Sequence, residues 1–314
     1  MRYDIRPCLT DDDYWRARQF LRDAYLANGR RDCCWQTYRL DYWRWHGLEN
    51  ILRRPLQEFL FLCEAEGGRL VALLSAEDRG DAFLNVHPAY RSEALDRKLI
   101  HAAAELLPAE TPDGGHTLNV WCRADDPGRQ ALLRELGYAR GDWPEHQRYR
   151  PMSLPIPDVS VPAGYVVRAL GDTAADPVEL ERRSWVSWRA FHPDAPDDQY
   201  ARDGGAWYRN IQRAPLYRRD LDLVIVAPDG AHAAFATVWF DDVTRSGAFE
   251  PVGVAPEHQR RGLATAVMNE ALRRLRHLGA TQATVGGYSI PANGLYASVG
   301  FTDFDLQERW VKAW

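Results

Sequence analysis

A loop of small residues leads into a helix in the second half of the chain, and its residue types suit the binding of a phosphate group. The stretch runs Val252-Gly253-Val254-Ala255-Pro256-Glu257-His258-Gln259-Arg260-Arg261-Gly262-Leu263-Ala264. Gly262 and Ala264 permit close backbone approach, and a helix N-terminus presents unpaired amides and a positive dipole end. Arg260 and Arg261 add positive charge. We predict a pyrophosphate site here; a plain loop before an amphipathic helix stays open as the alternative, because short glycine motifs recur by chance.

Two flanking features fit a ligand site. Pro251 lies in a run that otherwise has the pattern of a central strand, where it removes a ladder donor. We therefore predict a bulge or a splayed, unpaired place in this strand, and Gly253 would let a ligand lie against its backbone. Downstream, Asn293-Gly294-Leu295-Tyr296-Ala297-Ser298-Val299-Gly300-Phe301 places Tyr296 on a predicted short helix, four residues before Gly300.

Together these stretches resemble the GNAT superfamily of acetyl-CoA-dependent N-acetyltransferases. The family's pyrophosphate motif Q/R-x-x-G-x-G/A is matched by residues 259–264, and its later motif L-Y-x-x-x-G-F by residues 295–301. The order of strand, loop, helix, strand and tyrosine agrees over about residues 165–314. The resemblance implies acetyl-CoA as co-substrate. The pantetheine arm would bind to Val252, Gly253 and Val254. The pyrophosphate would bind to the loop formed by Gln259, Arg260, Arg261, Gly262, Leu263, Ala264 and Thr265.

An amine that attacks a thioester directly needs orientation, an acceptor for its proton and a proton source for the departing thiolate. Glu250, on the strand entering the loop, is the candidate base, acting through water; a surface carboxylate or substrate anchor is the alternative. Tyr296 is the acid that the resemblance implies; a core tyrosine is its alternative. The family often has Asn seven residues before this tyrosine, where this chain has Ser289, so Asn293 is the candidate cofactor contact in its place. The second half contains no cysteine that could act as a nucleophile, so we do not expect a covalent acetyl-enzyme.

The chain echoes itself on either side of the proline-rich segment 150–157, which we interpret as a linker. The paired segments, at offsets of 162, 168 and 163 residues, are Tyr3-Asp4-Ile5-Arg6 with Tyr165-Val166-Val167-Arg168, His87-Pro88-Ala89-Tyr90-Arg91 with Ala255-Pro256-Glu257-His258-Gln259, and Leu136-Gly137-Tyr138 with Val299-Gly300-Phe301. The repeat predicts a duplicated α/β domain divided into residues 1–150 and 151–314. With the resemblance it implies two tandem GNAT domains, each a mixed, mostly antiparallel sheet flanked by helices.

The first repeat departs from the family pattern at the positions that matter for a cofactor. Ala94 stands where the loop glycine is expected, and Asp96 where the last small residue is expected. A carboxylate there would repel a pyrophosphate. Leu133 stands at the tyrosine position. We therefore expect residues 1–150 to be a degenerate scaffold or acceptor-side domain and 151–314 to be catalytic; tandem members of the family, mycothiol synthase among them, are similar in this respect.

Apolar periodicity and turn residues place the elements of the second half. A helix is expected from Glu179 to Trp188. A hairpin of residues 223–227 and 233–240 should be followed by a strand over 248–254. A helix should run from Leu263 and end before Gly279, and another strand should begin at residue 283.

Aromatic residues offer candidates for an acceptor wall. Trp185, Trp188, Phe191 and Trp207 lie in the helical region that covers the acceptor site in this family, but core packing is the alternative. The aromatic segment 35–46 is expected either to help line a cleft between the domains or to pack the first domain.

Composition bounds the remaining choices. The 314 residues are 46% hydrophobic and 26% charged, as in ordinary globular proteins, and the formal net charge of −5 disfavours a nucleic-acid partner. No apolar run of about 18 residues occurs and the N-terminus has no signal-peptide core, so we expect no membrane partner. Cys8, Cys33, Cys34, Cys63 and Cys122 contain no C-x-x-C pair. We expect reduced thiols, no metal site and a cytoplasmic location.

The leading hypothesis is an N-acetyltransferase that moves the acetyl group of acetyl-CoA to a primary amine of a small acceptor in a ternary complex, as a monomer or homodimer. Residues 176–250 carry 13 acids and 9 arginines, a mild preference for a cationic amine. A thiol-precursor acceptor as in mycothiol synthase, a protein N-terminus, and a non-catalytic acetyl-CoA-binding module are the alternatives.

Overall fold

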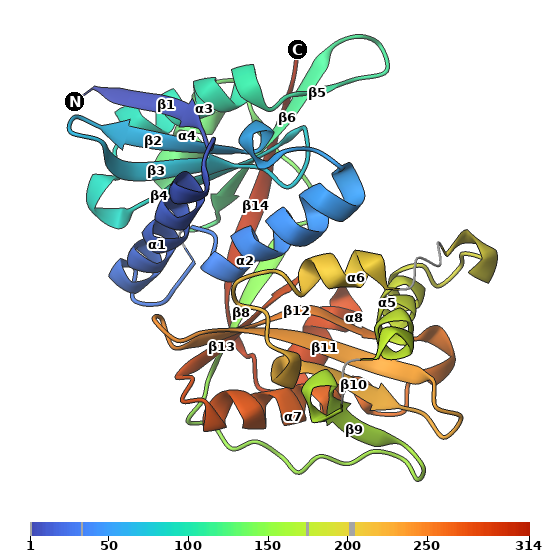
Figure 1. Ribbon diagram of the computed structural model, residues 1–314. Coiled ribbons are helices and arrows are strands. Elements are labelled where there is room, and N and C mark those ends of the chain that lie inside the picture. Colours follow the sequence, from blue (N-terminus) through green and yellow to red (C-terminus); the bar gives the residue numbers. More distant parts are fainter. Residues whose placement is uncertain (1, 33, 174–175, 201–204) are drawn as a thin grey trace. The chain divides into compact units, whose positions relative to one another are not determined.

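A computed structural model describes residues 2–32, 34–173, 176–200 and 205–314 of the chain (Figure 1). The chain forms two compact units, which are described one at a time. The first unit comprises residues 1–147 and 305–314, and the second unit comprises residues 148–304.

The second unit is a sheet with helices on both faces. Its strands lie in the order β8, β13, β12, β11, β10, β9, and all pairs from β12 to β9 are antiparallel, whereas β12 and β13 are parallel. Figure 1 shows α7 on one face of this sheet and α5 on the other. The elements are β9 (Val166–Ala169), α5 (Pro177–Phe191), α6 (Ala206–Ile211), β10 (Asp222–Val226), β11 (His232–Asp241), β12 (Ser246–Val254), α7 (Leu263–His277), β13 (Gln282–Gly287) and α8 (Ile290–Ser298).

Local sequence explains the two helices that matter most for the site. The Asp176 side chain accepts a hydrogen bond from the Val178 amide at the start of α5, and Pro177 occupies the first turn, where no backbone donor is needed. In α7 the predicted apolar face is buried against the sheet. Gly279 follows that helix with φ of +84°, a left-handed conformation that ends helices. The predicted helices and strands of this half are confirmed.

The first unit repeats the same order of elements. Its strands lie in the order β1, β2, β3, β4, β6, β14, with β4 and β6 parallel. The short strands β5 (Ala109–Glu110) and β7 (Ala139–Arg140) pair at its margin. The other elements are β1 (Tyr3–Pro7), α1 (Asp11–Ala27), α2 (Thr37–Tyr42) with a π-helical continuation (Trp43–Leu52), β2 (Leu60–Ala65), β3 (Arg69–Ser75), β4 (Asp81–Val86), α3 (Glu93–Leu106), β6 (His116–Arg123), α4 (Pro127–Glu135), β8 (Glu145–Pro151) and β14 (Asp303–Ala313). The predicted α/β class, with a mostly antiparallel sheet and flanking helices, is confirmed.

Each unit is completed by a strand from the other half of the sequence. Residues 307–313 of β14 pair with β6 in the first unit, antiparallel, with Trp310 opposite Val120. Residues 148–151 of β8 belong to the second unit, where β8 lies beside β13. The compact units therefore differ from a simple division at residue 150, because periodicity does not show which sheet edge a terminal strand will join.

Both units have their own hydrophobic core. The core of the second unit is built from α7 and the inward faces of β10 to β13, and includes Met152 and Phe301. The core of the first unit is built from α3 and β2 to β6 and includes Trp310 of β14. No helix within the described parts of the chain is long and apolar enough to cross a membrane.

Three cysteines of the first unit, Cys8, Cys63 and Cys122, are buried and carry free thiols. Cys34 donates from Sγ to the Val86 carbonyl at 3.5 Å, and Cys33 lies outside the described residues. Burial raises the pKa of Cys8 and Cys63 to about 11 and that of Cys122 to about 12. These three thiols are protonated and poorly nucleophilic at neutral pH.

Candidate active site

Strand β12 is bulged on one side and unpaired on the other. Its pairing with β11 skips from Phe249 to Val252, so Glu250 and Pro251 together face Thr237. Its parallel pairing with β13 ends at Phe249. The predicted bulge and splayed strand at Pro251 are therefore confirmed; the Glu250–Pro251 peptide bond is cis.

Beyond the bulge, one backbone edge of β12 faces a groove. Val252 to Val254 pair with β11 on one side only, and no strand of the described chain lies on the other side. Gly253 has no room for a side chain, since a Cβ there would lie 2.6 Å from the Phe235 ring and 2.9 Å from Ala190 Cβ. The edge can thus bind an extended ligand through its backbone N–H and C=O groups.

Helix α7 begins with amides that have no partner in the helix. Gly262 is its N-cap, with φ of +76°, and no side-chain hydrogen bond caps this end within the described chain. The first helical bond runs from the Ala266 amide to Gly262 O at 3.0 Å, which leaves the amides of residues 263–265 unused. The first turn holds no acidic residue. This end of α7 is therefore suited to an anion.

The open edge of β12 and the start of α7 line one open groove. Its lining is formed by Ala190, Phe191, Val252, Gly253, Val254, His258, Gln259, Arg260, Gly262, Leu263, Ala264, Thr265, Ser289, Pro291, Ala292, Leu295 and Tyr296. Most of the residues predicted to contact the cofactor, together with Tyr296, thus share one surface. Glu250, Arg261 and Asn293 do not line it.

Arg261 and Asn293 have partners outside the groove. Arg261 donates to the Tyr165 hydroxyl at 3.1 Å, and that hydroxyl also lies 2.9 Å from His258 Nδ1. Asn293 Oδ1 accepts from Arg148 Nε at 2.5 Å, and its Nδ2 donates to the carbonyls of residues 287 and 289 at 3.1 and 3.0 Å. These bonds hold the loop before α7 and the start of α8 in place.

Tyr296 and Glu250 lie close enough to influence each other. Tyr296 is 8% exposed and borders the groove from α8. Burial raises the pKa of its hydroxyl above the ordinary value, and the negative Glu250 carboxylate raises this pKa further. Glu250 is half-buried, and its carbonyl accepts a hydrogen bond from Trp239 Nε1 at 2.6 Å. The tyrosine hydroxyl therefore stays protonated and neutral over a wide pH range.

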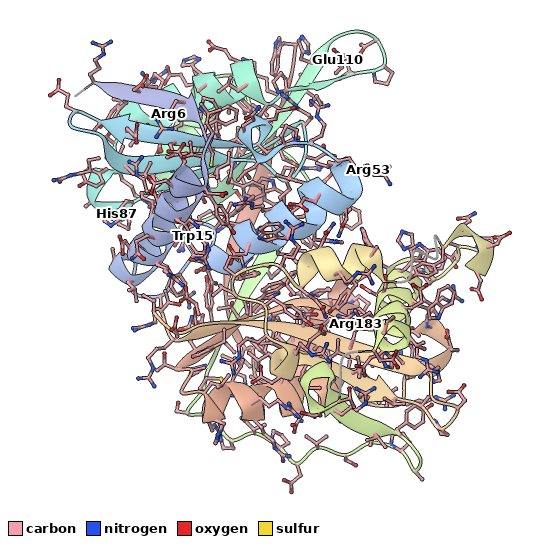
Figure 2. All side chains as sticks on the ribbon, viewed as in Figure 1. Arg6, Trp15, Arg53, His87, Glu110 and Arg183 are labelled. Atoms are coloured by element: carbon pink, nitrogen blue, oxygen red, sulfur yellow. The ribbon has the colours of Figure 1, made fainter. Side chains whose placement is uncertain are left out.

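A buried ion pair that the sequence did not reveal supports the floor of the groove. Arg183 of α5, labelled in Figure 2, donates from Nε to Asp222 Oδ1 at 3.0 Å and from Nη2 to Thr237 Oγ1 at 2.8 Å. Its guanidinium carbon lies 4.0 Å from the centre of the Phe235 ring. Arg183 thus fixes both Thr237, opposite the bulge, and Phe235, beneath Gly253. An arginine on an amphipathic helix gives no sequence signal of such burial.

The aromatic residues of α5 divide between the groove and a separate cluster. Phe191 lines the groove and is 56% exposed. Trp185 and Trp188 stack with ring centres 5.4 Å apart and both contact the Tyr200 ring. Neither of these two tryptophans lines the groove.

The corresponding helix start in the first unit is closed by its own side chains. Ser92 caps α3 by accepting from the Leu95 amide at 3.3 Å. Asp96, one turn inside, is 9% exposed and paired with Arg129. Leu133 is completely buried. The described residues of both units contain no group of three or more His, Cys, Asp or Glu side chains that could hold a metal ion.

Comparison with known proteins places this geometry in a family. The profile described as the acetyltransferase (GNAT) family matches residues 179–301. The mycothiol acetyltransferase of Thermomonospora curvata is 30% identical over 274 residues, which cover 80% of this chain and 84% of that protein. The chain belongs to the GNAT family of acetyltransferases. The resemblance based on the loop at 259–264 and the motif at 295–301 is thereby confirmed, and the chain is an acyltransferase.

Other relatives agree with this assignment. The mycothiol acetyltransferase of Beutenbergia cavernae is 28% identical over 244 residues, 72% of this chain and 74% of that protein. Two solved structures share the fold over 99% of this chain at 19% identity. A tandem GNAT protein from the clavulanic acid biosynthesis pathway has a TM-score of 0.67 and is covered to 98%; a GCN5-related N-acetyltransferase from Sphaerobacter thermophilus has a TM-score of 0.63 and is covered to 95%.

The co-substrate of the GNAT family, acetyl-CoA, fits the residues of this groove. A Cβ at Gly262 would meet no atom within 4 Å, so the space beside the N-terminal amides of α7 is open. The unpaired edge of β12, the start of α7 and Tyr296 all line the same groove. A diphosphate with an extended amide-containing arm matches these two surfaces.

Proposed function

We propose that the second unit transfers the acetyl group of acetyl-CoA to a primary amine of a small acceptor. The observation that carries the proposal is that one groove combines three features: an uncapped start of α7, an open edge of β12 and the buried phenol of Tyr296. Acetyl-CoA supplies an activated acetyl thioester when bound. The amine and the thioester are then held together in one ternary complex, which makes the transfer effectively unimolecular.

Each part of the groove has a proposed task in binding. The amides of residues 263–265 and the Arg260 side chain hold the pyrophosphate, and the backbone of residues 252–254 binds the pantetheine arm. Gln259 lines the same part of the groove. Arg261 and Asn293 are proposed to act by shaping the loop and the start of α8, through their bonds to Tyr165 and Arg148.

Two side chains have proposed tasks in proton transfer. The Tyr296 hydroxyl donates a proton to the departing thiolate. The Glu250 carboxylate accepts the amine's proton through a water molecule, since Glu250 does not itself line the groove. The phenol of Tyr296, whose pKa is raised above its ordinary value of 10.0, carries its proton at neutral pH, as this task requires.

The relatives favour one acceptor class within this proposal. Several relatives between 24% and 30% identical are mycothiol acetyltransferases. We therefore propose a mycothiol-type acceptor, the amine precursor of a small thiol, as the first candidate to test among small primary amines. The first unit, with its closed α3 start, is proposed to serve as scaffold.

The test is an acetyl-transfer assay that follows release of free CoA thiol with a panel of amines, alongside thermal shift with acetyl-CoA. Binding of acetyl-CoA and turnover of at least one small amine is the expected result. Binding without turnover of thiol-precursor amines, polyamines, amino acids or peptides would favour a non-catalytic acetyl-CoA-binding module. Absence of any stabilisation by acetyl-CoA would contradict the proposed groove.

A further inference from the structure

The first unit contains a pocket of its own where the second unit opens its groove. In both units the parallel strand pair at the centre of the sheet ends at a phenylalanine, Phe249 in the second and Phe83 in the first. The first unit's pocket begins at Phe83, whose ring stacks on Trp121 with centres 5.6 Å apart and planes within 5°. Trp35, whose ring centre lies 5.1 Å from that of Phe83, and Tyr38 and Arg39 of α2 also line it.

The charged side chains around this pocket are paired with one another. Arg39 donates from Nε to Glu77 at 2.7 Å and from Nη1 to Glu145 at 3.1 Å. Arg129 forms two hydrogen bonds with Asp96 at 2.8 and 3.2 Å. Because these arginines and carboxylates neutralise each other, an ionic ligand would be desolvated without gaining an unpaired counter-charge. The pocket therefore favours a neutral ligand.

Two buried polar atoms lining the pocket have no hydrogen-bond partner. One is the indole donor Trp35 Nε1, on a residue that is 6% exposed, and the other is the acceptor Gln147 Oε1, on a residue that is 3% exposed. The other end of the Gln147 amide is fixed, since its Nε2 donates to Glu145 Oε1 at 2.8 Å. Trp35 is fixed by its backbone amide, which donates to Asn85 Oδ1 at 2.7 Å. Buried polar groups in folded proteins are nearly always satisfied, so this donor and this acceptor indicate a missing partner.

We propose that the first unit binds a small neutral amide in this pocket. The amide carbonyl would accept from Trp35 Nε1, the amide N–H would donate to Gln147 Oε1, and an apolar substituent would lie on the aromatic wall of Phe83 and Trp121. An amide carries one strong acceptor and at least one donor without net charge, which matches the two unpartnered atoms and the paired arginines. This site is separate from acetyl-CoA binding by the second unit, and its existence does not depend on the proposed acetyl transfer.

The experiment titrates the full chain with N-methylacetamide, following tryptophan fluorescence and the indole N–H resonance of Trp35. Methyl acetate, which lacks the N–H, and sodium acetate, which is charged, are the comparison probes. Saturable binding of N-methylacetamide, about tenfold tighter than that of either comparison probe, is expected. Acetamide is included to distinguish an N-acetyl compound, the kind of product that acetylation of an amine would form, from a primary carboxamide.

Variants locate the binding. Gln147→Met and Trp35→Phe each remove one unpartnered atom and should weaken the binding of N-methylacetamide at least about tenfold. Gln19→Met, on the exposed face of α1, is the control and should leave this binding unchanged. Thermal unfolding midpoints check that the variants fold; if Trp35→Phe does not, Gln147→Met still decides. Equal affinity for N-methylacetamide and methyl acetate, unchanged affinity in Gln147→Met, or no saturable binding would overturn the proposal and leave a pocket filled by water.

Discussion

Arg129 of α4 holds Asp96 of α3 in a two-fold hydrogen-bonded ion pair, with nitrogen–oxygen distances of 2.8 and 3.2 Å. By the sequence repeat, Asp96 occupies the place that Ala264 has in α7 of the second unit. In the first unit, the carboxylate and the Ser92 cap occupy the helix start, and Arg129 makes this arrangement stable. In the second unit the same place is lined by small side chains and open amides.

This relationship predicts the effect of moving the carboxylate. Ala264→Asp should weaken acetyl-CoA binding by about 10- to 100-fold, because a negative charge in the first turn of α7 repels a pyrophosphate and competes for its amides. Isothermal titration with acetyl-CoA measures the change. The asparagine in Ala264→Asn has nearly the same shape as aspartate but no charge, so this variant should lose much less affinity for acetyl-CoA. Equal losses of affinity in the two variants would show that the size of the side chain, not its charge, matters there.

The ion pair itself should matter for stability. Asp96→Asn leaves Arg129 buried without its counter-charge and should lower the free energy of unfolding by about 3 kcal/mol. Urea unfolding measures this. Arg97→Met breaks pairs with Glu93 and Glu135 on the protein surface and should change stability little. If the two substitutions lower the free energy of unfolding equally, the Asp96–Arg129 pair does not stabilise the start of α3 as described above.

A backbone substitution separates the shape of the loop from its charge. Gly262 has φ of +76° and open space around its Cβ position, so Gly262→Val is opposed by backbone conformation rather than by contact. We expect it to weaken acetyl-CoA binding about tenfold, since the amides of α7 would be re-aimed. Gly230→Val is the matched control, because Gly230 has φ of +86°, equally open space and a place outside the groove. Gly230→Val should reduce stability and leave the affinity for acetyl-CoA unchanged. If Gly230→Val weakened acetyl-CoA binding and Gly262→Val did not, the proposed role of Gly262 in the cofactor site would be contradicted.

The sequence predicted those parts of the fold and groove that depend on local patterns. Pro251 within an apolar run predicted the bulge, and Gly279 predicted the end of α7, because each residue has a conformational limit that acts wherever it stands. The motif at 259–264 placed the groove because its glycine and helix start must be adjacent in the chain.

Features that depend on distant contacts were not predictable in the same way. The pairing of Asp96 with Arg129 depends on packing between residues 33 positions apart, and the hydrogen bond from the buried Arg183 to Thr237 on residues 54 positions apart. Strand β14 belongs to the first unit because it pairs with β6. No residue type within β14 predicts this pairing. Phe191 lines the groove because α5 crosses β12, and its helical spacing alone fits core packing equally well.

The proposed acid predicts a separation of catalysis from binding. Tyr296→Phe should lower kcat by about 10- to 100-fold and change the Kd for acetyl-CoA by less than about twofold, since only the proton is removed. Steady-state assays and titration measure the two quantities. Tyr138→Phe, which removes another buried hydroxyl in the first unit, is the control and should leave kcat unchanged.

The same residue has a pH signature. Because burial and the Glu250 carboxylate raise the pKa of Tyr296 above its ordinary value of 10.0, kcat should not fall near pH 10, where an ordinary phenol ionises. The stability that this shift contributes is present below pH 10 and is lost as the pH rises toward the folded-state pKa. A kcat that drops with an apparent pKa of 10 in the wild type, but not in Tyr296→Phe, would show that Tyr296 ionises as an ordinary phenol and would contradict the raised pKa.

A buried histidine should make the second unit sensitive to mild acid. His232, at the start of β11, is 4% exposed, and burial, with nearby arginines, lowers its pKa from 6.5 to about 3. Below pH 6.5, His232 therefore binds a proton in the unfolded chain but not in the folded chain. The stability that this group contributes is present above pH 6.5 and is lost as the pH falls toward 3. Between pH 7.5 and 5.5 the loss should be about 1.3 kcal/mol. Urea unfolding of wild type and His232→Gln at the two pH values measures it, with exposed His277→Gln as control. The His232 variant should lose about 1 kcal/mol less than the wild type over this interval; equal losses in all three proteins would mean that His232 can be protonated in the folded state.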